Sequence, residues 1–142
     1  MLGVFYLNGP LRIVANDTMV TPADVTWNKE FGMIFIDNPV GAGFSYVSGL
    51  GSQDETGFVR TEEEVGRDLY NLLVQFYADY PELHSNDLYI TGESYAGKYV
   101  PALAEYIRRK NLSEDLLFSG KCHFGPTHFL FASSQTPLSR LT

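Results

Sequence analysis

One serine of the chain lies in a pattern that could place it in an active site. Ser94 stands in the stretch Gly92-Glu93-Ser94-Tyr95-Ala96-Gly97, with small residues two positions away on either side. A nucleophilic serine on a sharp strand-to-helix turn needs such neighbours, because the backbones around it approach closely. Such a turn would expose Ser94 Oγ and direct the backbone N–H of Tyr95 toward an oxyanion. The alternative is a glycine-rich turn with an incidental serine.

The sequence around Ser94 predicts the strand and the helix that such a turn requires. Residues 87–91 form a short apolar run typical of a strand. A helix is expected to open at Pro101, since proline is favoured at a first helical position, and to end near residues 110–111. Alanine at position 96, where a second glycine is usual, is small enough for the turn. This context favours the nucleophile interpretation of Ser94.

Another strand and helix are predicted upstream. Residues 32–37 form a continuous apolar run, which is typical of a strand buried on both faces of a parallel sheet. Thr61 followed by Glu64 is a capping-box pattern that opens a helix, and Pro81 ends it at Tyr80. An apolar stripe on this helix faces a core: Val65, Leu69, Leu72, Leu73 and Phe76. The order strand, helix, strand, turn, helix predicts an α/β fold with a mostly parallel sheet and flanking helices.

The remaining segments give weaker predictions. Residues 2–7 and 11–14 are predicted to be short strands around a turn, and residues 15–30 and 41–57 are predicted to be loops. No sheet strand is predicted in residues 112–142, which combine a polar stretch with an end rich in serine, threonine and proline.

Composition and charge exclude several classes of function. The net charge of −7 argues against nucleic-acid binding, which requires a basic surface. No run of eighteen apolar residues exists, so no membrane span is expected. Cys122 is the single cysteine and cannot form an internal disulfide. The three histidines do not form a ligand pattern, and no metal or cofactor is expected.

Features of secreted proteins are mixed in this sequence. Asn16 and Asn111 each begin an Asn-x-Ser/Thr sequon and are candidate glycosylation sites. The first residues, however, lack the basic region, the long apolar core and the cleavage site of a signal peptide.

Four segments resemble segments of the serine carboxypeptidases and occur in the same order as in that family. Their residues are most similar to those of the vitellogenic-like carboxypeptidases. The segments are residues 3–10, 27–28, 36–46 and 92–104. The resemblance runs from residue 1 to about residue 110. It implies part of an α/β-hydrolase fold that lacks both ends, with residues 1–111 as the N-terminal part of that domain and residues 112–142 as a divergent or poorly ordered tail.

The resemblance also implies a reaction and its residues. Ser94 would attack the last peptide bond of a substrate and form an acyl-enzyme, and the Tyr95 N–H would be one oxyanion donor. Glu93 would help to hold the terminal carboxylate of the substrate, which requires a shared proton and therefore favours acid. Gly92, Ala96 and Gly97 would form the nucleophile elbow, which is the sharp strand-to-helix turn that carries Ser94. Peptide or protein C-termini are the implied partners, and the implied location is the secretory pathway, the lysosome or vacuole, or the extracellular space.

Three departures from the family pattern predict that this chain alone is inactive. Leu7 stands where the family has the glutamate that shares a proton with Glu93. The family's Asn-Gly-Gly-Pro-Gly segment, which supplies the other oxyanion N–H, would precede the first residue. The aspartate and histidine of the triad would lie beyond residue 142. Asp115, paired with His123 or His128, follows Ser94 too closely to belong to later sheet strands.

Three alternatives remain open at this point. The parent protein could be an esterase or an acyltransferase on the same fold. The chain could be a truncated relative that binds peptides without hydrolysing them. It could also be a fragment from an incomplete gene model. The preferred C-terminal residue of a substrate and the oligomeric state do not follow from the sequence.

Overall fold

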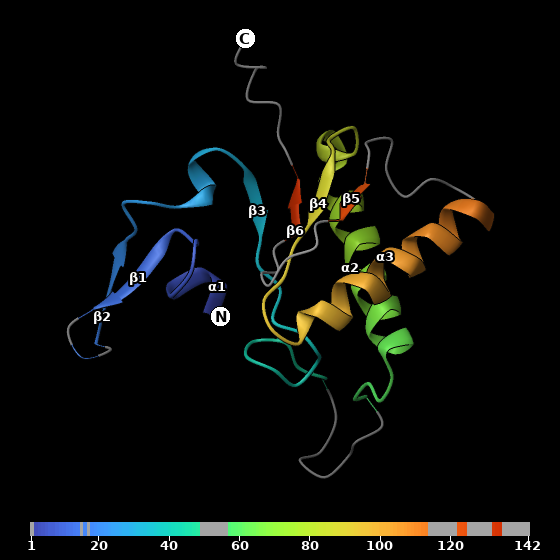
Figure 1. The fold of residues 1–142 in the computed structure, drawn as a ribbon, viewed down its shortest axis with the longest axis horizontal. Coiled ribbons are helices and arrows are strands. Elements are labelled where there is room, and N and C mark those ends of the chain that lie inside the picture. The colour runs from blue at the N-terminus through green and yellow to red at the C-terminus, as the bar shows by residue number, and fades with distance from the viewer. Residues whose placement is uncertain are drawn as a thin grey trace.

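A computed structural model of the chain describes residues 2–14, 16, 18–48, 57–113, 122–124 and 132–134. The elements in chain order are α1 (Leu2–Phe5), β1 (Leu11–Val14), β2 (Met19–Pro22), the 3₁₀ turn η1 (Trp27–Lys29), β3 (Gly32–Ile34), α2 (Glu62–Asp79), the 3₁₀ turn η2 (Pro81–Leu83), β4 (Leu88–Ile90), α3 (Ala96–Ser113), β5 (Cys122–Phe124) and β6 (Ala132–Ser134). They form a two-stranded hairpin and a four-stranded sheet with two long helices beside it (Figure 1).

The larger sheet has the strand order β3-β6-β4-β5. β4 and β5 are parallel, whereas β6 runs antiparallel to both β3 and β4. β3 and β4 therefore point in the same direction on either side of β6. The α/β organisation predicted from the sequence is confirmed. The expected mostly parallel sheet is not confirmed, because β6 lies between β3 and β4 and runs in the opposite direction to both.

Helix α2 begins where the capping-box pattern predicts. The Thr61 side chain accepts a hydrogen bond from the backbone N–H of Glu64 at 3.2 Å, and Glu64 Oε2 accepts one from the N–H of Thr61 at 3.0 Å. These bonds satisfy two of the donors that a helix start leaves unpaired. The helix ends at Asp79, directly before Tyr80 and Pro81, as predicted.

The core lies between α2, α3 and β4, which Figure 1 shows beside one another. The buried residues are Val65, Leu69, Leu73, Tyr77, Leu88, Ile90, Val100, Leu103 and Ile107. The helices cross closely at Gly66, where a Cβ would lie 2.7 Å from the carbonyl oxygen of Ala102. Strand β4 is the strand that the elbow needs, and this core fixes it against both helices.

Helix α3 begins earlier than the sequence predicts. It starts at Ala96, so Pro101 lies inside the helix rather than at its first position. Proline lacks the N–H that would bond to the carbonyl of Gly97, one turn earlier. This loss falls near the helix start, and the packing of Val100, Leu103 and Ile107 into the core maintains the helix around it.

The N-terminal segment differs most from the prediction. Residues 2–5 form the short helix α1 instead of a strand, with the Tyr6 N–H donating to the Leu2 carbonyl at 2.9 Å. A strand needs a neighbouring strand to satisfy its backbone, and here the segment satisfies it locally. Residues 19–22, predicted to be loop, form β2 and pair antiparallel with β1.

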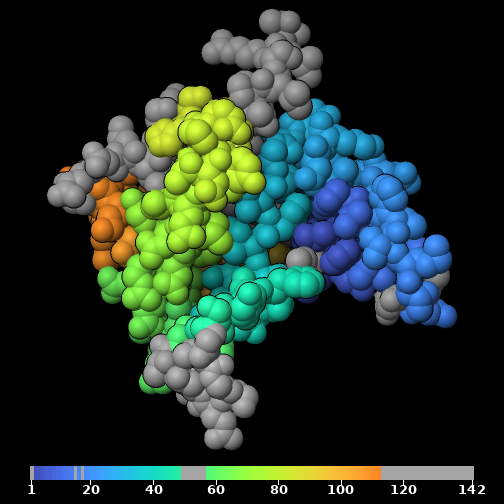
Figure 2. All heavy atoms as spheres, turned by 180° about the vertical axis from the view of Figure 1, so that it is seen from behind, coloured from blue at the N-terminus to red at the C-terminus, as the bar shows by residue number. Residues whose placement is uncertain are grey.

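Seen from behind in Figure 2, residues 32–48 lie between this hairpin and α2.

Two short strands occur in the C-terminal region where none was predicted. β5 and β6, of three residues each, both pair with β4. β3 also differs slightly, since it ends at Ile34 rather than at residue 37. Three-residue strands are too short to show an alternating pattern in the sequence. The division of the chain into residues 1–111 and a tail remains a prediction.

Candidate active site

Ser94 occupies the turn that joins β4 to α3. β4 ends at Ile90, α3 begins at Ala96, and Ser94 between them is exposed with a φ of +59°. A positive φ is uncommon for a residue other than glycine and marks a conformation that the surroundings must hold in place. The predicted strand-turn-helix setting of Ser94 is thus present.

The backbone after Ser94 forms the first turn of α3. The N–H groups of Ala96, Gly97 and Lys98 donate to the carbonyls of Glu93, Ser94 and Tyr95 at 3.2, 3.0 and 2.9 Å. The Tyr95 N–H precedes these bonded groups, at the helix end where orphan donors and the positive end of the dipole lie. This is the electrostatic setting in which a backbone N–H stabilises an oxyanion.

A cavity of about 390 Å³ opens beside Ser94. Its apolar wall includes Leu7, Ile34 and Ile36 from the N-terminal half and Leu69 and Leu103 from the two helices. Its polar lining is Asp37, Asn38, Glu93 and Ser94. Glu93 is itself exposed, and Leu7 lines the same cavity. The cavity combines an apolar pocket with a few convergent polar groups, which is typical of a binding site for a small ligand.

Asp37 organises a loop that lines this cavity. Asp37 Oδ2 accepts a hydrogen bond from the Phe44 N–H at 3.0 Å, and the Ser45 hydroxyl donates to the Asp37 carbonyl at 2.5 Å. Gly43 lies in this loop with a φ of +55° and lines the cavity. Sequence reasoning did not select Asp37 or Asn38. The available signal was their position at the end of the apolar run of residues 32–37, because ligand sites of α/β sheets lie at the carboxyl ends of strands.

The side chain of Tyr95 is held at the rim of the cavity. Its hydroxyl donates to Glu62 Oε1 at 3.1 Å, and its ring lies 5.1 Å from the ring of Tyr99. The Lys98 ammonium lies 5.1 Å from the centre of the same ring. Burial raises the pKa of the Tyr99 hydroxyl, and the nearby charges of Glu62 and Tyr95 raise it further. Glu62 is a further site residue that the sequence did not reveal, because Glu62 and Tyr95 are 33 positions apart.

Other residues considered from the sequence either lie outside the described part of the chain or do not line the cavity. Asp115 and His128 lie outside the described residues, as does the side chain of His123 in β5. Asn16 is exposed in the hairpin turn with a φ of +53°. Asn111 lies in the last turn of α3. Glycosylation of either asparagine remains a prediction.

The described part of the chain contains neither a candidate metal site nor a candidate membrane span. Within residues 2–113 outside the gaps, and in the two short strands that follow, no three acidic, histidine or cysteine residues form a group that could hold a metal ion. None of the described helices has the length and apolar character needed to cross a membrane.

Comparisons with known proteins agree on one family. Residues 1–120 match the family described as serine carboxypeptidase. The chain is 46% identical over 108 residues to the probable serine carboxypeptidase CPVL of Dictyostelium discoideum, covering 76% of this chain and 20% of that protein. It is 46% identical over 112 residues to the venom serine carboxypeptidase of Apis mellifera, covering 79% of this chain and 23% of that protein. It is 41% identical over 114 residues to the serine carboxypeptidase-like protein 48 of Arabidopsis thaliana, covering 80% of this chain and 21% of that protein. The chain thus spans about a fifth of each relative.

Proposed function

Because the chain belongs to the serine carboxypeptidase family, we propose that Ser94 is the nucleophile of a serine carboxypeptidase in the complete protein. The observation that carries the proposal is the position of Ser94, with a φ of +59° between β4 and α3 and at the edge of the cavity. Ser94 Oγ attacks the carbonyl carbon of the last peptide bond while a base takes its proton. The C-terminal amino acid leaves, and water then hydrolyses the acyl ester.

Two neighbours of Ser94 have proposed roles. The Tyr95 N–H stabilises the oxyanion of the tetrahedral intermediate, which is supported by its place before the first bonded turn of α3. Glu93 shares a proton with the terminal carboxylate of the substrate, which is supported by its place on the same cavity. Gly92 and Ala96 are buried and leave room for the elbow between them.

We infer that the chain forms part of an α/β-hydrolase domain whose sheet is mostly parallel when complete. The common direction of β3 and β4 and the parallel pairing of β4 with β5 support it.

The substrates and the location follow from the same proposal. The substrates are peptides or proteins with a free C-terminus, and the enzyme works in the secretory pathway, in the lysosome or vacuole, or outside the cell. This chain by itself turns over no substrate, since the proposed triad aspartate and histidine come from sequence beyond it.

A chimera tests the function directly. Residues 1–110 of this chain replace the aligned residues of the Apis mellifera relative, which supplies the remaining domain. The expected result is release of the C-terminal amino acid from an N-blocked dipeptide, and loss of this activity in the Ser94→Ala variant. Ser85→Ala, at an exposed serine in the turn before β4, is the matched control and keeps the activity. A chimera that cleaves simple esters but never a peptide with a free C-terminus would contradict the carboxypeptidase assignment.

A further inference from the structure

The residue after Ser94 is tied to the start of α2. The Tyr95 hydroxyl donates to Glu62 Oε1 at 3.1 Å, which joins the elbow to the first turn of the other long helix. Glu62 Oε2 is buried and has no hydrogen-bond partner among the described residues. The carboxylate is therefore oriented by Tyr95 while its other oxygen is withdrawn from water. A hydrogen bond to a charged acceptor is stronger than one between neutral groups.

The contact fixes a side chain that would otherwise be mobile. Tyr95 is 54% exposed, and its ring contacts among the described residues, with Tyr99 and Lys98, come from the adjoining helix α3. These contacts move with α3 and do not place the elbow relative to the rest of the domain. The bond to Glu62 does so, because α2 is anchored in the core by Val65 and Leu69, within two turns of Glu62.

We propose that Glu62 is a positioning residue of the elbow, which holds the Ser94–Tyr95 peptide in place by accepting the hydrogen bond of the Tyr95 hydroxyl. Its consequence for catalysis rests on the proposed function, since the N–H of this peptide is the proposed oxyanion donor. The effect of Glu62 on the conformation of the elbow does not depend on the proposed function, and it can be measured in the chain without any catalytic turnover.

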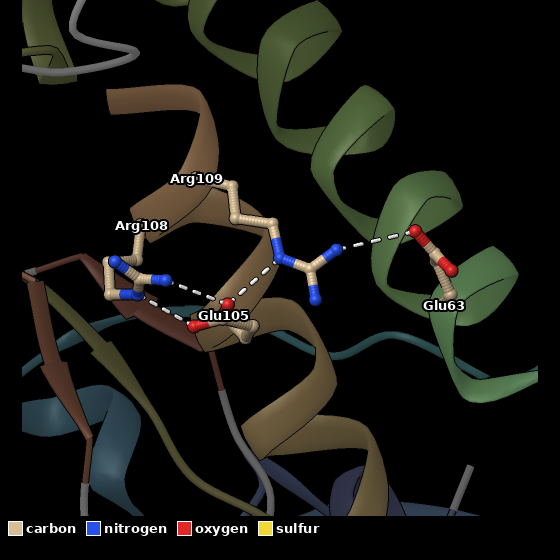
Figure 3. Close-up of polar contacts among 4 residues, drawn as sticks. All are labelled: Glu63, Glu105, Arg108 and Arg109. Carbon is tan, nitrogen blue, oxygen red and sulfur yellow. Dashed lines mark hydrogen bonds and ion pairs between the residues drawn. The ribbon is translucent and has the colours of Figure 1, made fainter. Parts of the chain in front are cut away.

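The neighbouring Glu63 provides a matched control. Both glutamates lie in the acidic first turn of α2, where negative charge interacts favourably with the helix dipole. Glu63 turns instead toward the far end of α3, where Glu63 Oε1 lies 3.4 Å from Arg109 (Figure 3). A role limited to stabilising the start of α2 would therefore be shared by the two residues, whereas positioning of the elbow belongs to Glu62 alone.

Hydrogen exchange in the full chain, read by mass spectrometry on peptides that cover residues 92–99, tests the proposal. Glu62→Ala and Tyr95→Phe should each speed exchange of the elbow amides by about fivefold, as expected for loss of one local constraint. Glu62→Gln retains an acceptor oxygen, although a neutral one, so its elbow amides should exchange more slowly than those of Glu62→Ala. Glu63→Ala should leave the elbow unchanged. Tyr95→Phe retains the ring and the start of α2, so it remains informative if Glu62→Ala fails to fold.

Three results would overturn the proposal: unchanged elbow exchange in Tyr95→Phe, an equal effect of Glu63→Ala, or elbow exchange in Glu62→Gln that is as fast as in Glu62→Ala. The chimera adds a kinetic measurement, in which Glu62→Ala lowers kcat and leaves KM nearly unchanged. If Glu62→Ala and Tyr95→Phe speed elbow exchange but the chimera is inactive, the proposed function is refuted and the positioning role stands. If the two variants leave elbow exchange unchanged but the chimera is active, the positioning role is refuted and the proposed function stands.

Discussion

Asp37 Oδ2 accepts a hydrogen bond from the Phe44 backbone N–H across 3.0 Å, and this bond folds the loop after β3 back against the cavity beside Ser94. Gly43 lies next to this bond with a φ of +55°. A Cβ at Gly43 would overlap the Asp37 carboxylate. The loop that lines the cavity is therefore built on an acidic side chain and on a glycine that leaves room for it.

Gly43→Ala should destabilise the chain, because alanine must adopt the left-handed conformation and displace the Asp37 carboxylate. The expected cost is about 1–3 kcal/mol in the free energy of unfolding, measured by urea denaturation. Gly97→Ala is the matched control, since a Cβ at Gly97 meets no atom within 4 Å. It should stabilise helix α3 by about 0.5–1 kcal/mol. Equal effects of the two substitutions would show that the Asp37 contact imposes no constraint.

Thr61→Ala should weaken the start of α2. The Thr61 hydroxyl accepts the hydrogen bond of the Glu64 N–H, so its removal leaves a donor without its cap. A loss of about 1 kcal/mol is expected from chemical denaturation. Thr61→Ser keeps the hydroxyl and should retain most of the stability; a serine variant as unstable as the alanine variant would argue against the cap.

Glu105 should make stability depend on acidity. Hydrogen bonds from Arg108, which has the larger effect, and from Arg109 lower the pKa of Glu105 from its usual 4.5 to about 2 (Figure 3). Because the folded-state pKa is below the unfolded value, this stabilisation is fully present above pH 4.5 and is lost as the pH falls toward about 2. Glu105→Gln should make the decline of the melting temperature across this range shallower, while Asp37 and Glu64, whose pKa values are also lowered, maintain the rest of it.

Glu82→Gln provides the control for this pH series. Glu82 is exposed in η2, and no ion pair of Glu82 is found among the described residues. Its replacement should leave the acid-dependent decline unchanged. A Glu105→Gln variant whose melting temperature declines as steeply as that of the parent would contradict the role of the two arginines.

Long periodic elements and short motifs could be predicted from the sequence. α2 is marked by its capping box, its apolar stripe and a terminating proline, and all three act within one helix. The turn at Ser94 is marked by small residues and a preceding apolar strand. Both features depend on local steric and hydrogen-bonding rules, which a single sequence contains.

Features that depend on distant contacts could not be predicted. Residues 2–5 were expected to be part of a strand because they are apolar, but they form helix α1, and no strand among the described residues pairs with them. α3 starts before Pro101 because packing against α2 outweighs one missing hydrogen bond. The bond between Glu62 and Tyr95 joins residues 33 positions apart, and no local pattern indicates it.

Glu93→Gln in the chimera should alter the choice of substrate rather than the chemistry. Glu93 lines the cavity beside Ser94, and as a proton-sharing partner it favours substrates that carry a free carboxylate. We expect kcat/KM for an N-blocked dipeptide to fall by about tenfold or more, and that for the corresponding C-terminal amide to change little. The ratio of the two constants is the measurement. A parallel loss on both substrates would place Glu93 outside carboxylate recognition.

The most direct measurement of the central claim is the site at which a fluorophosphonate reacts. Such probes label a serine that a catalytic base has activated. Mass spectrometry of the labelled chimera should find the phosphonyl group on Ser94, and the isolated chain, which lacks the proposed base, should label slower by about 10⁴-fold or more. Label on another serine of the chimera, or equal labelling of its Ser94→Ala variant, would show that Ser94 is not the nucleophile.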